Sequence, residues 1–245
     1  MNPRLNYVDY EGGFGPPLLI AHGLYGSARN WGAIAKRLSA DRPVRVVDMR
    51  NHAGSPWFDT HTYGDMATDL AQVMPEGASL LGHSMGGKAA MTLALSVPGL
   101  IDRLIVADIA PVAYTHDPGD ILDAIATVDL TGVERRSDAD AALKGVVTDP
   151  SVRAFVLQSL DVKERRWRLN IDVLRQEMPN IIGFPDADGA FEGSTLFLSG
   201  GQSTYVLPQH RDRINLVMNP IGDFEDSPEF RSLAVLFVGI QLLFR

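Results

Sequence analysis

The feature that most constrains this sequence is a glycine-flanked serine between an apolar run and a helix-forming segment. Residues 80–87 read Leu-Leu-Gly-His-Ser-Met-Gly-Gly, and residues 88–95 read Lys-Ala-Ala-Met-Thr-Leu-Ala-Leu. A serine at a sharp strand-to-helix turn has its hydroxyl lifted clear of the backbone, where a substrate carbonyl can reach it. Such a turn is crowded and needs almost no side chain two positions before and after the serine, as Gly82 and Gly86 provide. This pattern predicts that Ser84 is a nucleophile.

The surroundings of Ser84 separate this interpretation from an ordinary glycine-rich turn. A nucleophile turn needs a strand before it, a helix after it and an oxyanion loop earlier in the chain. Residues 18–21 read as a short buried strand, and residues 22–27, His-Gly-Leu-Tyr-Gly-Ser, follow it directly. The glycines of this loop let backbone N–H groups approach a ligand closely. The context therefore favours the nucleophile, with the backbone N–H groups of Leu24 and Met85 as the oxyanion hole.

The order of apolar and helical segments predicts a doubly wound α/β fold. Short apolar runs that do not alternate with polar residues are typical of parallel strands covered on both faces. Strands are expected at residues 4–10, 18–21, 44–48, 78–81 and 104–107, and helices at residues 28–38 and 63–74. Ligands of such sheets bind at the carboxyl ends of the strands. His22, Ser84 and Asp108 all fall at such ends.

The strand rhythm stops between residues 112 and 189. Four helices are expected there, at residues 121–128, 138–147, 151–160 and 171–178. We therefore predict a helical lid at residues 112–189, inserted into a hydrolase core made of residues 1–111 and 190–245. Its apolar residues either line an acyl pocket or pack the lid onto the sheet, and packing is favoured for any single residue. The core resumes with a strand at 195–198, a helix at 208–213 and a strand at 216–218.

Composition excludes several classes of function. The net charge of −8 leaves no basic stripe that could neutralise nucleic-acid phosphates. With no cysteine, the chain has no disulfide, no thiolate nucleophile and no cysteine-based metal site. The first residues lack an apolar signal core, and the apolar run at 233–243 is shorter than the roughly 20 residues of a membrane span. We expect a cytoplasmic protein without a membrane span.

Six segments of the sequence together resemble a known family, the small α/β-hydrolase esterases of the bacterial YbfF type and their mitochondrial relatives. The resemblance covers residues 18–213 and is carried by residues 22–27, 47–52, 82–88, 108–112, 167–170 and 200–206. It implies the α/β-hydrolase fold and hydrolysis of small acyl esters or thioesters, with no cofactor and no metal. It also implies Ser84 as nucleophile, Asp108 as the acid of the triad, and Ser203 as an accessory serine near the triad histidine. From the residues alone, Asp108 could instead be a turn or cap aspartate, and Ser203 a plain turn residue.

The sequence departs from the family pattern where the catalytic base belongs. The triad order is serine, acid and then a histidine after the last strand, yet no histidine lies beyond His210. Asp223 stands roughly where the base is expected. Five of the six histidines each have a more ordinary interpretation: two structural residues of the active-site loops, a turn residue, a residue at the lid entrance too close to Asp108 and a solvated helix residue. These are His22, His83, His52, His116 and His210.

Two hypotheses follow. The first is a serine carboxylesterase or thioesterase that forms an acyl-enzyme on Ser84, with Asp108 as acid and an unidentified base. The second is a binding protein on a hydrolase scaffold whose catalysis is impaired because the histidine is missing. The apolar tail at residues 230–244 is also unlike the family, and we expect it to be buried under the sheet or in a homodimer.

Overall fold

The computed structural model describes residues 4–116, 118–186, 189–201 and 203–221. Within these residues, one seven-stranded sheet has the order β1-β3-β2-β4-β5-β8-β9. Its strands are β1 (Tyr7–Tyr10), β2 (Leu18–Ala21), β3 (Val44–Val47), β4 (Ser79–His83), β5 (Leu104–Ala107), β8 (Phe191–Leu198) and β9 (Met218–Pro220). Only β1 runs antiparallel to its neighbour; the other pairings are parallel. The predicted mostly parallel α/β fold is confirmed.

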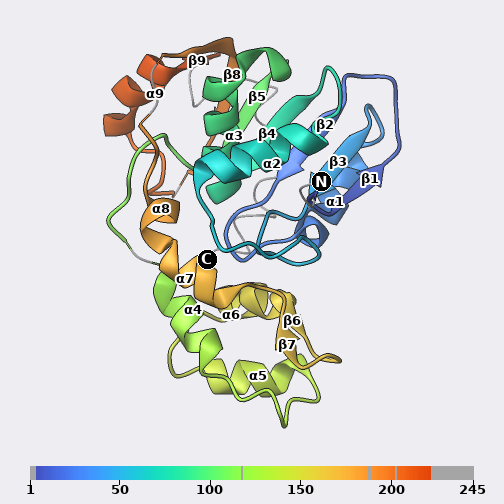
Figure 1. Ribbon diagram of the computed structural model, residues 1–245, viewed down its shortest axis with the longest axis vertical. Helices are drawn as coiled ribbons and strands as arrows, with labels where there is room; N and C mark the ends of the chain where they lie inside the picture. Colours follow the sequence, from blue (N-terminus) through green and yellow to red (C-terminus); the bar gives the residue numbers. More distant parts are fainter. Residues whose placement is uncertain (1–3, 117, 187–188, 202, 222–245) are drawn as a thin grey trace.

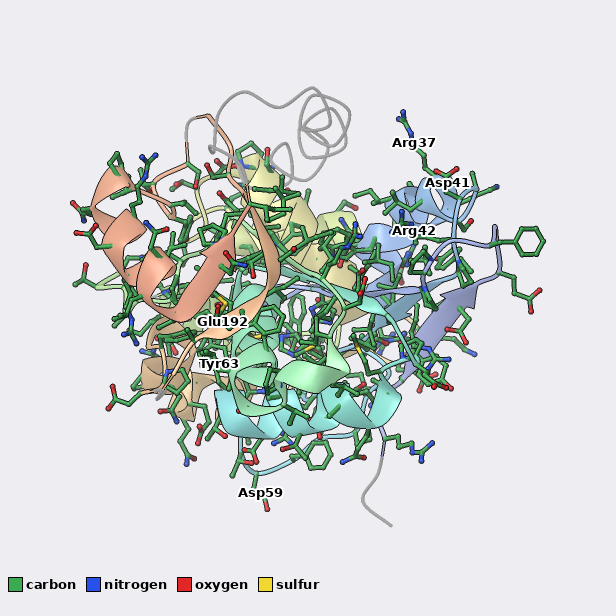
Figure 2. All side chains as sticks on the ribbon, turned by 90° about the horizontal axis from the view of Figure 1, so that it is seen from above. Arg37, Asp41, Arg42, Asp59, Tyr63 and Glu192 are labelled. Atoms are coloured by element: carbon green, nitrogen blue, oxygen red, sulfur yellow. The ribbon has the colours of Figure 1, made fainter. Side chains whose placement is uncertain are left out.

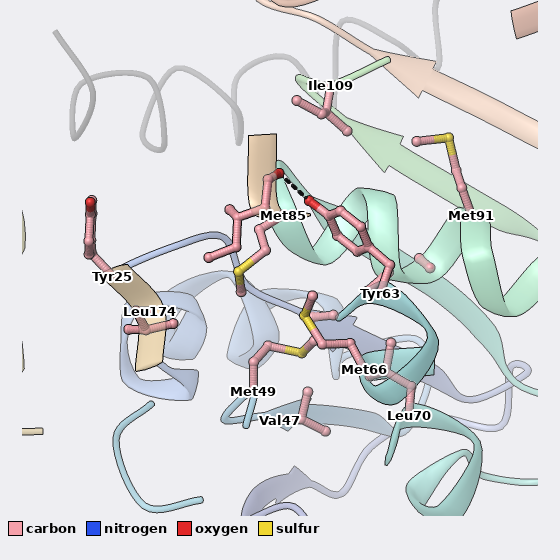
Figure 3. Close-up of a cluster of buried hydrophobic side chains, with 14 of the residues drawn as sticks. Tyr25, Val47, Met49, Tyr63, Met66, Leu70, Met85, Met91, Ile109 and Leu174 are labelled. Carbon is pink, nitrogen blue, oxygen red and sulfur yellow. Dashed lines mark hydrogen bonds between the residues drawn. The ribbon is translucent and has the colours of Figure 1, made fainter. Parts of the chain in front are cut away.

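The central strands are buried on both faces, which explains why their sequences do not alternate. In β2, Leu19 and Ala21 belong to one buried cluster, whereas Leu18 and Ile20 belong to another. The first cluster lies under α2 (Tyr63–Val73) and α3 (Met85–Ser96), and the second under the 3-10 turn η1 (Ala28–Trp31) and α1 (Gly32–Leu38). Figures 1 and 2 show α2 and α3 side by side on one face of the sheet and α1 on the other. In the first cluster, Met49, Met66 and Met85 meet below the ring of Tyr63 (Figure 3).

A largely helical layer lies between β5 and β8 in the sequence and below the sheet in Figure 1. It contains α4 (Gly119–Ala126), α5 (Arg136–Leu143), α6 (Pro150–Val156), the 3-10 turn η3 (Leu157–Ser159), β6 (Leu160–Asp161), β7 (Arg166–Trp167), α7 (Ile171–Gln176) and α8 (Met178–Ile182). The four expected helices are present. The helix expected at 151–160 ends earlier, because the chain tightens at η3 and then enters the antiparallel β6–β7 hairpin.

The described part of the chain ends with η4 (Pro208–His210), α9 (Arg211–Val217) and β9. The strand expected at 216–218 begins only at Met218, because α9 continues to Val217. Asp223 and the apolar tail at 230–244 lie outside the described residues. Among the helices that the structure describes, none combines the length and the hydropathy needed to cross a membrane.

One turn of the core, residues 51–53, makes main-chain hydrogen bonds to the helical layer. The Ala53 N–H donates to the carbonyl of Arg168 over 2.7 Å, and the Asn170 N–H donates to the carbonyl of Asn51 over 3.0 Å. Asn51 and Ala53 have φ values of +63° and +48°, a left-handed backbone that bends the turn sharply. The positions of β7 and of the segment before α7 are therefore fixed by main-chain bonds to the core.

Candidate active site

Ser84 stands at the sharp turn between β4 and α3 that the sequence predicted. Its backbone has φ +50° and ψ −119°, a strained conformation for a residue with a side chain. A Cβ at Gly82 would lie 2.3 Å from the carbonyl oxygen of Gly86, and one at Gly86 would lie 2.4 Å from that of Ala21. Both glycines are therefore required by close backbone contacts. Ser84 itself is half-buried, although its neighbours on both sides are buried.

The side chain of Ser84 lines a cavity of about 250 Å³. Leu24, Met85 and Asp108 line the same cavity, so the predicted oxyanion donors and acid share its wall with the serine. A Cβ added to Gly23 would lie 3.1 Å from the Cβ of Ser84, so the oxyanion loop packs directly against the serine. The rest of the wall is mostly apolar and comes partly from the helical layer: Ile109, Ile121, Val152, Phe155, Ile181 and Ile182. A larger cleft of about 550 Å³ contains none of the predicted site residues.

Asp108 follows β5 in a left-handed conformation, with φ +56°, and its N–H donates to the carbonyl of Leu198 over 2.7 Å. Burial raises the pKa of Asp108, while hydrogen bonds from the Ser203 side chain and the Gly200 backbone oppose that rise. Ser203 is thus placed against the predicted acid. The Oδ1 atom of Asp108 is buried and has no hydrogen-bond partner among the described residues. An acceptor of this kind could receive a ring N–H from a histidine.

Two histidines hold the oxyanion loop. The Nε2 atom of His22 accepts a hydrogen bond from the Met49 N–H over 2.9 Å, and its Nδ1 donates to the carbonyl of Gly23 over 2.8 Å. The Nε2 atom of His52 accepts from the Tyr25 N–H over 3.3 Å. Burial lowers the pKa of both rings, which keeps them neutral and able to accept. These contacts agree with the interpretation of His22 as a structural residue and of His52 as a turn residue.

Two other histidines line the Ser84 cavity, His83 and His116. Burial, and secondarily the charge of His22, lowers the pKa of His83 to about 4. His116 is exposed, and its Nε2 lies 2.9 Å from the Tyr205 hydroxyl, another group on the wall. The sequence interpretation dismissed His116 because of its closeness to Asp108 in the chain. His210, interpreted as a solvated residue, is half-buried, and its ring lies 6.0 Å from that of Tyr114.

Sequence reasoning missed one charged residue on the cavity wall, Lys88. It stands four positions after Ser84 on α3 and is 1% exposed. The signal was available, because side chains four residues apart lie on the same face of a helix. For a metal, the described residues offer no group of three or more His, Cys, Asp or Glu side chains.

The known proteins that this chain resembles include hydrolases, esterases and a lipase. The model of the "Alpha/beta hydrolase family" matches residues 18–235. The sn-1-specific diacylglycerol lipase ABHD11 of Mus musculus is 40% identical over 213 residues, which are 81% of this chain and 69% of that protein. Esterase YbfF of Escherichia coli is 37% identical over 203 residues, 80% of this chain and 78% of that protein. The solved structure of a marine microorganism esterase has a TM-score of 0.85 and 30% identity, and covers 99% of both chains.

Proposed function

This chain belongs to the alpha/beta hydrolase family, and from that premise we propose that it is a serine carboxylic ester hydrolase that forms an acyl-enzyme on Ser84. One observation carries the proposal: Ser84 stands at a strained turn on a cavity wall that it shares with Asp108 and the oxyanion loop. Relatives named as an esterase and a lipase support the same reaction class. They do not favour the alternative of a binding protein with impaired catalysis.

In the proposed reaction, the Ser84 Oγ attacks the ester carbonyl while a base takes its proton. The tetrahedral oxyanion receives hydrogen bonds from the backbone N–H groups of Leu24 and Met85, at the positive end of the α3 dipole. The C–O bond of the ester then breaks, and the alcohol leaves with the proton. Water attacks the acyl-enzyme in the same way and releases the acid. The negative charge of Asp108 on the same cavity wall favours the protonated base, and a hydrogen bond from Ser203 holds the Asp108 carboxyl in place.

We assign the role of catalytic base to His116. In the family pattern this role belongs to a histidine after the last strand. All six histidines of the chain lie within the described residues, and His116 and His83 are those on the cavity wall. With its pKa lowered to about 4, His83 is poorly matched to proton transfer at neutral pH. If Nε2 of His116 donates to the Tyr205 hydroxyl, the lone pair of Nδ1 remains available to accept a proton.

The lid is part of the proposal. Residues 112–189 would form a lid over the cavity, with Ile121, Val152 and Phe155 contacting the acyl chain. A volume of about 250 Å³ suits a small acyl group, as an ester or a thioester. A cytoplasmic location and a homodimer formed through residues 230–244 stay predictions.

The test is turnover of 4-nitrophenyl butyrate together with labelling by a fluorophosphonate probe. We expect Ser84→Ala to abolish labelling and to lower kcat by up to about a millionfold, as when a serine hydrolase loses its nucleophile. His116→Gln should lower kcat by about 100-fold or more if it takes the proton. Ser39→Ala, a serine on the α1 cap, is the matched control. Equal turnover by wild type and Ser84→Ala would end the proposal.

A further inference from the structure

Lys88 is a buried cation on the wall of the cavity that holds Ser84. It is 1% exposed, although lysine is among the residues least often buried without an acidic partner. Lysine side chains on a helix lean toward its N-terminus, and Ser84 caps the N-terminus of α3. The two residues are one turn apart, about 6 Å along the helix axis. Lys88, its hydrogen-bond partner Ile182 and Ser84 all line the same cavity, so the cation belongs to the wall of the site.

The contacts of Lys88 satisfy its hydrogen-bonding only in part. Its Nζ donates to the carbonyl oxygen of Ile182 over 2.8 Å and to that of Gly183. It also lies 4.7 Å from the ring centroid of Tyr114 and 5.8 Å from that of Tyr63. An ammonium group has three N–H donors, and the described residues supply hydrogen-bond acceptors for two of them. No carboxylate of the described residues lies within ion-pair distance of Nζ.

The charge of Lys88 is costly in this place. Burial lowers its pKa to about 7, which means that the protein destabilises the ammonium form. Two carbonyl groups at the end of α8 could be held by a neutral donor without that cost. Among the described residues that line the wall, Asp108 is the one with a carboxyl group, and it accepts hydrogen bonds from Ser203 and Gly200. A counter-charge brought by a ligand would complete the site.

We infer that Lys88 recognises a carboxylate on the acyl side of the substrate, so that the preferred esters are monoesters of short dicarboxylic acids. The inference rests on the proposed hydrolase function. With the ester carbonyl at Ser84, the acyl chain of such a monoester runs along the shared cavity wall towards Lys88. The methylene groups then pack against Ile109 and Ile182, which line the same cavity. One cation offers a partner to one negative charge, which favours a monoester over a polyanion.

The experiment compares ethyl hydrogen glutarate with its neutral isostere, ethyl 5-methylhexanoate, by release of ethanol. A charge-assisted hydrogen bond predicts that wild type prefers the anionic ester by about 10- to 100-fold in kcat/KM. Lys88→Met should remove or reverse this preference. A structural role in anchoring α8 would lower kcat/KM for both esters by the same factor. Lys36→Met, an exposed lysine on α1, controls for the loss of one positive charge.

A binding measurement does not depend on folding of the Lys88 variant or on catalysis. By calorimetry, Ser84→Ala should bind ethyl hydrogen glutarate at least about tenfold more tightly than its neutral isostere, ethyl 5-methylhexanoate. Equal binding of the two, or equal turnover of the two esters by wild type, would overturn the inference while leaving the hydrolase intact. If neither ester is turned over and Ser84→Ala matches wild type on all esters, the proposed function itself has failed.

Discussion

The carboxyl group of Asp108 carries a buried oxygen without a donor among the described residues, and this has a cost. A buried acceptor left unsatisfied typically costs about 1–3 kcal/mol. Burial also raises the pKa of Asp108, so the fold disfavours its charged form at neutral pH. In the proposed mechanism the negative charge is useful, because an anion on the cavity wall favours the protonated form of the base through its electric field. Stability and catalysis therefore make opposite demands on this one side chain.

We expect Asp108→Asn to lower kcat/KM by about 1,000- to 10,000-fold, as a triad acid does when its charge is removed. The melting temperature at pH 7 should stay the same or rise, because the amide does not have to be buried as an anion. Ester turnover and thermal melting of the same preparation measure both effects. Asp59→Asn, an exposed aspartate, is the matched control. A variant that melts lower and keeps full activity would contradict the assigned role.

At the scale of elements, the turn between β4 and α3 is held by contacts between backbones. Gly86 packs its Cα against the carbonyls of Ala21 and His22, 2.4 Å and 2.5 Å from where a Cβ would stand. These carbonyls belong to the end of β2 and the start of the oxyanion loop. An added methyl group would push the nucleophile turn and the oxyanion loop apart.

Gly86→Ala should therefore lower the free energy of unfolding by about 1–3 kcal/mol, as overpacking of a core does, and should also lower kcat. Gly99→Ala is the control, because a Cβ there would meet no atom within 4 Å. Urea unfolding of the two variants gives the comparison. Equal stability of both would show that the backbone contact at Gly86 relaxes freely.

The elements that the sequence predicted well are those with a strong local signal. The strands β2 to β5 were placed within two residues, because each is a short, mostly apolar segment bounded by polar, proline or glycine residues. The two-residue strands β6 and β7 are too short to show any periodicity; the expected helix at 151–160 overlapped only the first residue of their hairpin, and residues 161–170 were assigned no element. Their pairing depends on contacts that are not local in sequence.

The candidate site divides in the same way. The glycine-flanked turn at Ser84 could be derived from steric requirements. The family resemblance implied Ser203 as an accessory serine near the triad histidine, and its contact with Asp108, which joins residues far apart, was not predicted. Lys88 was overlooked although its spacing of four residues from Ser84 on a predicted helix places the two residues on one face. The place of His116 on the cavity wall depends on how the chain turns after β5, which its spacing from Asp108 does not reveal.

For the whole molecule, the buried histidines make stability sensitive to acid. Burial lowers the pKa of His22, His52, His61 and His83, to about 3 for His61 and about 4 for His83. In the unfolded chain these rings take up protons near pH 6.5. The unfolded state therefore binds more protons than the native state below that pH, and stability falls as pH decreases.

We expect the free energy of unfolding to drop between pH 6.5 and 4.5 by up to about 1.4 kcal/mol per pH unit for each buried histidine. Urea titrations at several pH values measure the slope. His61→Asn should make the slope shallower, whatever its effect on stability at pH 7, whereas His116→Gln removes an exposed imidazole and serves as the control. A slope that does not change with His61→Asn would contradict the burial argument.

The turn at residues 51–53 joins the helical layer to the oxyanion loop through Tyr25. The Tyr25 N–H donates to His52, the Tyr25 carbonyl accepts from the Ser159 hydroxyl over 2.9 Å, and the Tyr25 hydroxyl donates to the carbonyl of Pro118 over 2.8 Å. One residue thus bridges three parts of the chain. A chimaera that exchanges the helical layer for that of a relative would therefore also have to exchange Tyr25 and the turn at residues 51–53. The helical layer, the turn and Tyr25 contact one another and have to be compatible.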